Sequence, residues 1–173
     1  IYGTRFHDLP QTGNVPLAAD MSSCILSEPL DVSRFGMIYA GAQKNMGPAG
    51  LTVVVIREDL LGNARPACPT MFNYQIHVDN GSMYNTPPTY AIYIFKLVLE
   101  WLINDIGGLD SMKAINEEKA GLLYTFLDQS NLFKGTVEKK DRSLMNIPFV
   151  TGNDELDAKF VKEASANGFI NLK

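Results

Sequence analysis

The sequence predicts an α/β protein with a partial, mainly parallel sheet, followed by part of a smaller α+β region. Three apolar runs rich in β-branched residues occupy the early part of the chain, at 15–19, 37–40 and 51–56. Continuous runs of this kind are typical of strands covered on both faces. From residue 86 onward, apolar residues instead recur at helical spacing over three stretches.

Polar residues follow two of the predicted strands. Asp20 comes directly after the first run, and Gln43 and Lys44 come shortly after the second. Ligands of an open α/β sheet bind at the carboxyl ends of its strands. The sequence therefore places these three side chains where a ligand would be held.

The later elements are predicted from their start and stop signals. Thr86 is the expected N-cap of a helix that has Pro87 at its first position and ends near residue 104. Gly107–Gly108 ends that helix and marks the predicted boundary between a large domain, 1–108, and a small one, 109–173. The elements expected in the small domain are a helix from about 109, a strand at 145–149, a helix at 156–164 and a strand at 169–172.

Composition limits the classes of function. The chain has 173 residues, of which 46% are hydrophobic and 20% charged, with a formal net charge of -4. Mild acidity without a basic cluster argues against a nucleic-acid partner. The longest apolar stretch, 90–103, is interrupted by Lys96 and Glu100, which favours a buried helix over a membrane span. Cys24 and Cys68 have no metal or redox spacing, so a reduced, cytoplasmic setting is expected.

The two ends of the chain suggest a piece of a larger protein. The sequence begins at Ile1 without an initiator methionine and stops within a predicted strand. A sheet that lacks neighbouring segments would expose apolar surface. We therefore expect the strand around Val53 and the helix at 90–103 to expose apolar faces and to promote association.

Lys44 and Asp20 together predict a pyridoxal-phosphate site. Lys44 lies among small, turn-forming residues between Gly41 and Gly50. A lysine at the mouth of a sheet can form a Schiff base, and a nearby carboxylate can bind a pyridinium nitrogen. Two alternatives remain open at this point: Lys44 as a solvent-exposed turn residue, and Asp20 as the cap of the turn that follows it.

Gln43, Asn85 and Thr86 are candidates for holding a phosphate. Asn85 and Thr86 open a predicted helix, where side chains and backbone N–H groups can bind an anion. Simple N-capping is the alternative for this pair, and a solvated loop side chain is the alternative for Gln43. His7 and His77 have no acidic or cysteine partner at ligand spacing, so no metal site is predicted.

Taken in order along the chain, these segments resemble the phosphoserine aminotransferases, which are fold-type-I, class-V pyridoxal-phosphate enzymes. The resemblance covers nearly the whole chain without large gaps. The segments that carry it include Ala-Asp-Met-Ser-Ser at 19–23, Gly-Ala-Gln-Lys-Asn at 41–45, Asn-Thr-Pro-Pro-Thr at 85–89 and Arg-Ser-Leu-Met-Asn at 142–146.

The resemblance implies the aspartate aminotransferase-like fold of pyridoxal-phosphate-dependent transferases, with 1–108 in the large domain. It implies that Lys44 carries the cofactor, Asp20 binds its ring nitrogen and Gln43 contacts its phosphate. Asn85 and Thr86 would reach the phosphate of the cofactor bound by the other subunit of a homodimer. The implied substrates are small molecules, and neither nucleic acid nor a membrane is involved.

The reaction implied by the resemblance is amino transfer between L-glutamate and 3-phosphohydroxypyruvate, which gives O-phospho-L-serine and 2-oxoglutarate. This step belongs to serine biosynthesis, and bacterial members serve an analogous step in pyridoxine biosynthesis. The family's stacking aromatic ring and its substrate-binding arginines are not found in this sequence. The 173 residues alone are therefore expected to be inactive. The alternatives are a non-catalytic module and another fold-type-I enzyme.

Overall fold

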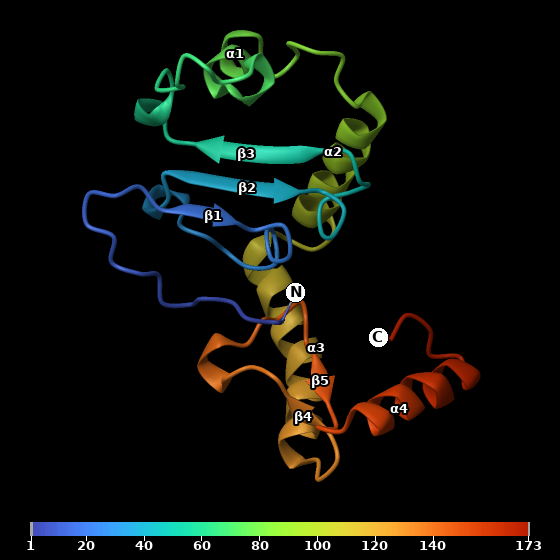
Figure 1. Ribbon diagram of the computed structural model, residues 1–173. Coiled ribbons are helices and arrows are strands. Elements are labelled where there is room, and N and C mark those ends of the chain that lie inside the picture. The colour runs from blue at the N-terminus through green and yellow to red at the C-terminus, as the bar shows by residue number, and fades with distance from the viewer. Residues whose placement is uncertain (1, 173) are drawn as a thin grey trace. The chain divides into compact units, whose positions relative to one another are not determined.

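The computed structural model describes residues 2–172, which form two compact units (Figure 1). One unit is Pro10–Lys113, and the other joins Ile1–Leu9 to Ala114–Lys173. The limits of these units differ from 1–108 and 109–173, because helix α3 (Leu109–Gln129) crosses from one into the other and the first residues pack with the later part of the chain. The predicted domain division concerns a longer protein and stays a prediction.

The first unit contains a three-stranded sheet in the order β1-β2-β3. Its strands are β1 (Ala18–Asp20), β2 (Met37–Gly41) and β3 (Thr52–Ile56). β1 and β2 run parallel, so their carboxyl ends lie at the same edge, whereas β2 and β3 are antiparallel. The α/β class is confirmed, but this part of the sheet is half parallel rather than mainly parallel.

The first strand is shorter than predicted. Pairing begins at Leu17, whose carbonyl accepts hydrogen bonds from the N–H groups of Gly36 (2.8 Å) and Met37 (3.2 Å). Val15 instead belongs to a turn, since its N–H donates to Thr12 O at 3.1 Å, and its side chain is 68% exposed. Pro16, which has no N–H to donate, separates this turn from the strand.

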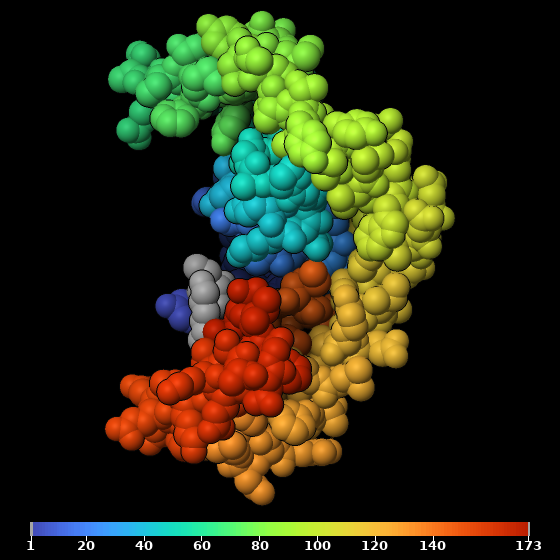
Figure 2. Space-filling model, turned by 90° about the vertical axis from the view of Figure 1, so that its right-hand side faces the viewer, coloured from blue at the N-terminus to red at the C-terminus, as the bar shows by residue number. Residues whose placement is uncertain are grey.

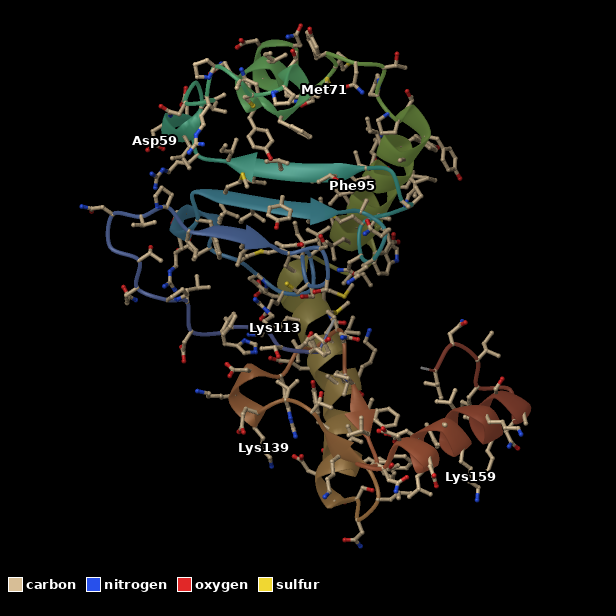
Figure 3. All side chains as sticks on the ribbon, in the orientation of Figure 1. Asp59, Met71, Phe95, Lys113, Lys139 and Lys159 are labelled. Carbon is tan, nitrogen blue, oxygen red and sulfur yellow. The ribbon has the colours of Figure 1, made fainter. Side chains whose placement is uncertain are left out.

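A small apolar core lies where β2 runs into the loop 42–51, which we call the lysine loop. Ala40, Ala42 and Met46 are at most 1% exposed. Partly buried side chains from the neighbouring segments pack against them: Ile25, Leu26, Leu51, Val53 and Phe95. Phe95, labelled in Figure 3, comes from helix α2 (Thr89–Asn104), which covers this end of the sheet.

The opposite side of α2 is exposed and apolar. Tyr90 is 72% exposed, Tyr93 54% and Trp101 46%. The α2 side chains stand at the surface of the molecule in Figure 2, where they are coloured yellow-green. The expectation of an exposed apolar face on this helix agrees with the structure. On the strand around Val53 the outcome is mixed, because Val53 is partly buried in the core while Val55 is 46% exposed.

Helix α2 begins later than predicted. Pro88, at φ -74° and ψ 73°, is its N-cap, and no side chain caps the helix. The reason lies in the Pro-Pro pair: a residue that precedes proline is disfavoured in the helical region, so Pro87 cannot open the helix. A further short helix, α1 (Tyr74–Asp79), was not predicted; Asn73 caps it by accepting from Gln75 N–H.

The second unit is built around α3 and an aromatic cluster. A two-stranded antiparallel sheet, β4 (Lys134–Gly135) with β5 (Phe149–Val150), precedes helix α4 (Asp154–Ala166). Phe133 packs edge-on against Phe149 and Phe160, with ring centroids 5.4 and 5.0 Å apart. The short 3-10 turns of the described residues are Val32–Arg34, Glu58–Leu60, Thr70–Phe72 and Lys139–Asp141.

Two strand predictions in this unit are wrong. The segment expected at 145–149 becomes a strand only at Phe149, because Ser143 Oγ accepts hydrogen bonds from the N–H groups of Met145 (3.1 Å) and Asn146 (3.2 Å) and bends the chain. The segment expected at 169–172 is irregular, and Asn171 has a positive φ of 67°. Among the described helices, none combines the length and apolar character needed to cross a membrane.

Candidate active site

Asp20 ends β1 and is held in place by Ser22. The Ser22 N–H (2.9 Å) and the Ser22 hydroxyl (2.6 Å) both donate to Asp20 Oδ1. Within residues 2–172, Asp20 Oδ2 receives no hydrogen bond. Asp20 therefore caps the turn through Oδ1, as the alternative predicts, and Oδ2 remains available to a ligand.

Lys44 lies in a tight turn of the lysine loop. The N–H groups of Met46 (3.0 Å) and Gly47 (2.9 Å) donate to Ala42 O, and Ala42 N–H donates to Leu51 O at 2.9 Å. Ala42 and Met46 point inward, whereas Lys44 is exposed. Its ammonium forms no ion pair or hydrogen bond in the part of the chain that the structure describes. The backbone is thus fixed while the amine is available.

The structure brings Asp20 and Lys44 together at one sheet edge. Parallel pairing sets Asp20 beside Tyr39, two residues before β2 ends and the lysine loop begins. The two Ser22 hydrogen bonds lower the pKa of Asp20 below its usual range, and the positive charge of Lys44 lowers it further. The arrangement therefore presents an ionised carboxylate and a free amine to the same side of the sheet.

Gln43 lies against Gly41. A methyl group added at Gly41 would come within 2.5 Å of Gln43 Oε1 and within 3.1 Å of Gln43 Nε2. The glycine therefore leaves room for the amide at the start of the lysine loop. Gln43 is exposed, so its amide can donate to a group bound at this edge.

Asn85 and Thr86 belong to the segment between α1 and α2, which comes from neither β1 nor the lysine loop. The segment between α1 and α2 runs beyond the β3 edge of the sheet in Figure 1, while β1 and Asp20 form the opposite edge. Both residues are exposed, and the N-capping alternative is wrong because α2 begins at Thr89. Asn85 Nδ2 donates only to Thr86 O, at 3.3 Å, within the described chain.

Sequence reasoning placed Gly41 near the cofactor and Ser22 in the turn after Asp20, but it missed the link that the Ser22 hydroxyl makes between them. Ser22 touches both strands, because Gly41 N–H donates to Ser22 Oγ at 3.0 Å and that hydroxyl donates to Asp20. The Asp-x-Ser spacing was the available signal for this role. This link could not be assigned without knowing that β1 and β2 are neighbours.

The described His, Cys, Asp and Glu side chains do not form a metal site. Among residues 2–172, no group of three His, Cys, Asp or Glu side chains lies close enough to hold a metal ion. His77 contacts Met71 O at 2.9 Å, and His7 contacts Arg142 O at 3.1 Å. Both histidines are therefore bound to backbone carbonyls within the fold.

Arg142, in one of the segments that carry the resemblance, is engaged within its own unit. It forms a bidentate pair with Asp128, at 2.6 and 3.1 Å, and its guanidinium lies 4.4 Å from the ring centroid of Tyr124. Arg142 and Lys139 hold the pKa of Asp128 far below its usual range. These contacts show that Arg142 stabilises the second unit.

Comparison with known proteins identifies the family. Residues 3–167 match the sequence pattern described as "Aminotransferase class-V". The chain belongs to this family. A phosphoserine aminotransferase of Pseudomonas syringae pv. syringae is 58% identical over 173 residues, covering 100% of this chain and 48% of the relative. One from Streptococcus suis is also 58% identical, over 174 residues, with 47% of the relative covered.

Solved structures agree with this class-V assignment. The phosphoserine aminotransferase from Bacillus circulans subsp. alkalophilus matches with a TM-score of 0.93 at 48% identity, over 100% of this chain and 48% of that chain. A PLP-bound phosphoserine aminotransferase from Trichomonas vaginalis matches with a TM-score of 0.90 at 40% identity, over 99% and 49%. The fold of pyridoxal-phosphate-dependent transferases is confirmed. The chain spans about half the length of these relatives.

Proposed function

We propose that this chain supplies the lysine and the ring-binding acid of a phosphoserine aminotransferase. The reaction is amino transfer between L-glutamate and 3-phosphohydroxypyruvate, giving O-phospho-L-serine and 2-oxoglutarate in the cytoplasm. It serves serine biosynthesis and, in a bacterium, pyridoxine biosynthesis as well. One observation carries the proposal: a free amine and a free, ionised carboxylate oxygen lie at one sheet edge of a class-V aminotransferase chain.

The residues at this edge fit pyridoxal phosphate. Asp20 Oδ2 has no partner in the described chain, and Asp20 is ionised because Ser22 holds its pKa low. An ionised carboxylate suits a protonated ring nitrogen. Among the described residues, Lys44 Nζ also has no partner and the Gln43 amide makes no hydrogen bond, so this amide can donate to a phosphate oxygen. These are the donor, acceptor and amine that the cofactor requires.

The cofactor supplies an aldehyde for the amino groups and a ring that stabilises negative charge at the substrate's Cα. The chain's own residues do the rest. Asp20 keeps a proton on the ring nitrogen, and Lys44 Nζ moves the proton at the substrate's Cα. Gln43 holds the phosphate end. The buried side chains of Ala42 and Met46 hold the backbone of the lysine loop in place, while the side chain of Lys44 stays free to move.

Asn85 and Thr86 complete the site of a second copy in this proposal. Their side chains are exposed and do not cap α2, and their segment lies beyond the sheet edge opposite Asp20. Polar side chains in that position can serve a phosphate bound by another subunit. The proposed enzyme is therefore a homodimer with shared sites.

Borohydride reduction tests the lysine. The complete natural polypeptide that contains this sequence is incubated with pyridoxal phosphate, reduced, and analysed by intact mass and peptide mapping. The expected result is one cofactor on Lys44, lost in Lys44→Ala and kept in Lys140→Ala, a matched exposed lysine. Label spread over several lysines, or no label, would overturn the assignment of Lys44.

The substrate is tested by comparing amino acceptors. The proposal expects rapid amino transfer from glutamate to 3-phosphohydroxypyruvate and much slower transfer to hydroxypyruvate or glyoxylate. Equal or faster use of an acceptor without a phosphate would favour another fold-type-I aminotransferase. The chain 1–173 by itself is expected to show no transfer, and activity of that chain would contradict its proposed dependence on further segments.

Mixed dimers test the shared site. Lys44→Ala and Asn85→Ala proteins are each expected to be weakly active, and mixing them under exchange conditions should restore activity. One of the two sites in a mixed dimer then has both Lys44 and the partner's Asn85 intact. If Asn85 serves its own subunit, mixing restores nothing.

A further inference from the structure

Two turns of this chain have the same sequence pattern and the same local hydrogen bonds. In each, an aspartate Oδ1 accepts from the N–H and the hydroxyl of the serine two residues later. The distances are 2.9 and 2.6 Å for Asp20 and Ser22, and 3.0 and 2.6 Å for Asp31 and Ser33. Both aspartates have a lowered pKa for this reason.

The two turns differ in what else the serine touches. Ser22 Oγ also accepts a hydrogen bond of 3.0 Å from the N–H of Gly41, the last residue of β2. Ser33 Oγ has no bond beyond its own turn in the described residues, and it lies on an exposed 3-10 turn. Only the first turn is therefore joined to a neighbouring strand.

We propose that Ser22 is a positioning residue that ties Asp20 to the base of the lysine loop through Gly41. Its hydroxyl donates to Asp20 Oδ1 and accepts from the backbone where the loop leaves β2. Two consequences follow for the site. Asp20 is held with Oδ2 turned out of the turn, and its position is fixed relative to the segment that carries Lys44.

The charge of the neighbouring groups supports this role. Lys44 is the charged side chain of the described residues whose field reaches Asp20, and it acts in the same direction as the Ser22 hydrogen bonds. The contribution of Ser22 to cofactor binding depends on the proposed function. The connection from Asp20 through Ser22 to Gly41 does not depend on it and can be measured without cofactor.

The test uses three variants of the complete polypeptide: Ser22→Ala, Ser22→Thr and Ser33→Ala. In cofactor-free protein, Ser22→Ala should speed hydrogen exchange of the Gly41 amide about tenfold or more, since that amide loses its acceptor. Ser22→Thr, which keeps the hydroxyl, should restore protection. Ser33→Ala should leave Gly41 unchanged while it raises the pKa of Asp31, measured by carboxyl carbon NMR.

The affinity for pyridoxal phosphate gives the second readout. Ser22→Ala is expected to weaken binding about tenfold, and Ser33→Ala to leave it unchanged. Ser22 would be an ordinary turn residue if Ser22→Ala only raised the pKa of Asp20, by as much as Ser33→Ala raises the pKa of Asp31. In that case neither the exchange rate of the Gly41 amide nor the affinity for pyridoxal phosphate would change. If the wild-type protein binds no cofactor at Lys44, the proposed function fails, and the Gly41 exchange still decides the role of Ser22.

Discussion

Met46 offers the sharpest test of how the fold supports Lys44. Its side chain is 1% exposed and packs with Ala40 and Ala42, which have no exposed surface. Met46 N–H also closes the turn that contains Lys44, by donating to Ala42 O at 3.0 Å. The substitution Met46→Ala removes the packing and leaves this backbone bond intact.

The expected cost follows from the packing. Methionine-to-alanine changes in well-packed cores cost about 2–5 kcal/mol, and the cost is larger where the surroundings cannot collapse. The two fully buried neighbours are alanines, which cannot fill the space, and the larger neighbours such as Leu51 and Phe95 are only partly buried and can fill part of it. We therefore expect a loss of about 3 kcal/mol, near the middle of that range and a large part of the 5–15 kcal/mol that is typical of a domain.

Urea unfolding of the cofactor-free polypeptide measures this cost. Met46→Leu, which nearly conserves volume, should lose less than about 1.5 kcal/mol. Met83→Ala, at a position 67% exposed, should change stability by no more than about 0.5 kcal/mol. A loss below about 1 kcal/mol for Met46→Ala, similar to that of Met83→Ala, would refute the argument that this side chain anchors the lysine loop.

Three further tests concern the position of Gln43 beside Gly41, the ion pair of Asp128 with Arg142, and the exposed face of α2. Gly41→Ala should displace the Gln43 amide and so weaken pyridoxal-phosphate binding about tenfold, as measured by fluorescence titration. An unchanged affinity would show that the position of this amide beside Gly41 does not matter for binding. Asp128→Asn should lower the melting temperature at neutral pH. Because the pKa of Asp128 is depressed in the folded state, its carboxylate stabilises the fold above the unfolded pKa of about 3.9, and this stabilisation fades at lower pH. The difference in melting temperature between the wild type and Asp128→Asn should therefore narrow on acidification. A difference that stays constant with pH would exclude the ion pair as its cause. Replacing Tyr93 and Trp101 by serine should reduce self-association of chain 1–173 in sedimentation, and unchanged association would place the contact elsewhere.

The positions of Asp20 and Lys44 at one sheet edge could be predicted because they depend on local patterns. Each residue follows an apolar run, and parallel neighbours bring such ends together. The direction of β3 could not be predicted in this way, since an apolar run reads the same in either direction. The predicted start of α2 is wrong because Pro87, although proline is common at the first helical position, is itself followed by Pro88, which disfavours a helical backbone at Pro87.

The role of Ser22 depends on neighbours that the sequence does not reveal. Asp20-Met21-Ser22 and Asp31-Val32-Ser33 are equivalent as patterns, and both form the same turn. Only the pairing of β1 with β2 brings Gly41 to the first serine. The wrong strands at 145–149 and 169–172 have a related cause, because two hydrogen bonds to one serine side chain, or one left-handed residue, are enough to prevent an extended strand.

Residues around Lys44 that are needed for folding lie only a few positions from residues that are needed for amino transfer. In a library of all single substitutions, a screen for folded protein and a screen for amino transfer would give different maps of tolerance here. Positions that face the core should fail both screens, and positions that face solvent should fail only the second. The first group is Ala40, Ala42 and Met46, and the second is Gln43 and Lys44. An engineer who wishes to change the chemistry of this edge without losing the fold would therefore vary the second group and leave the first untouched.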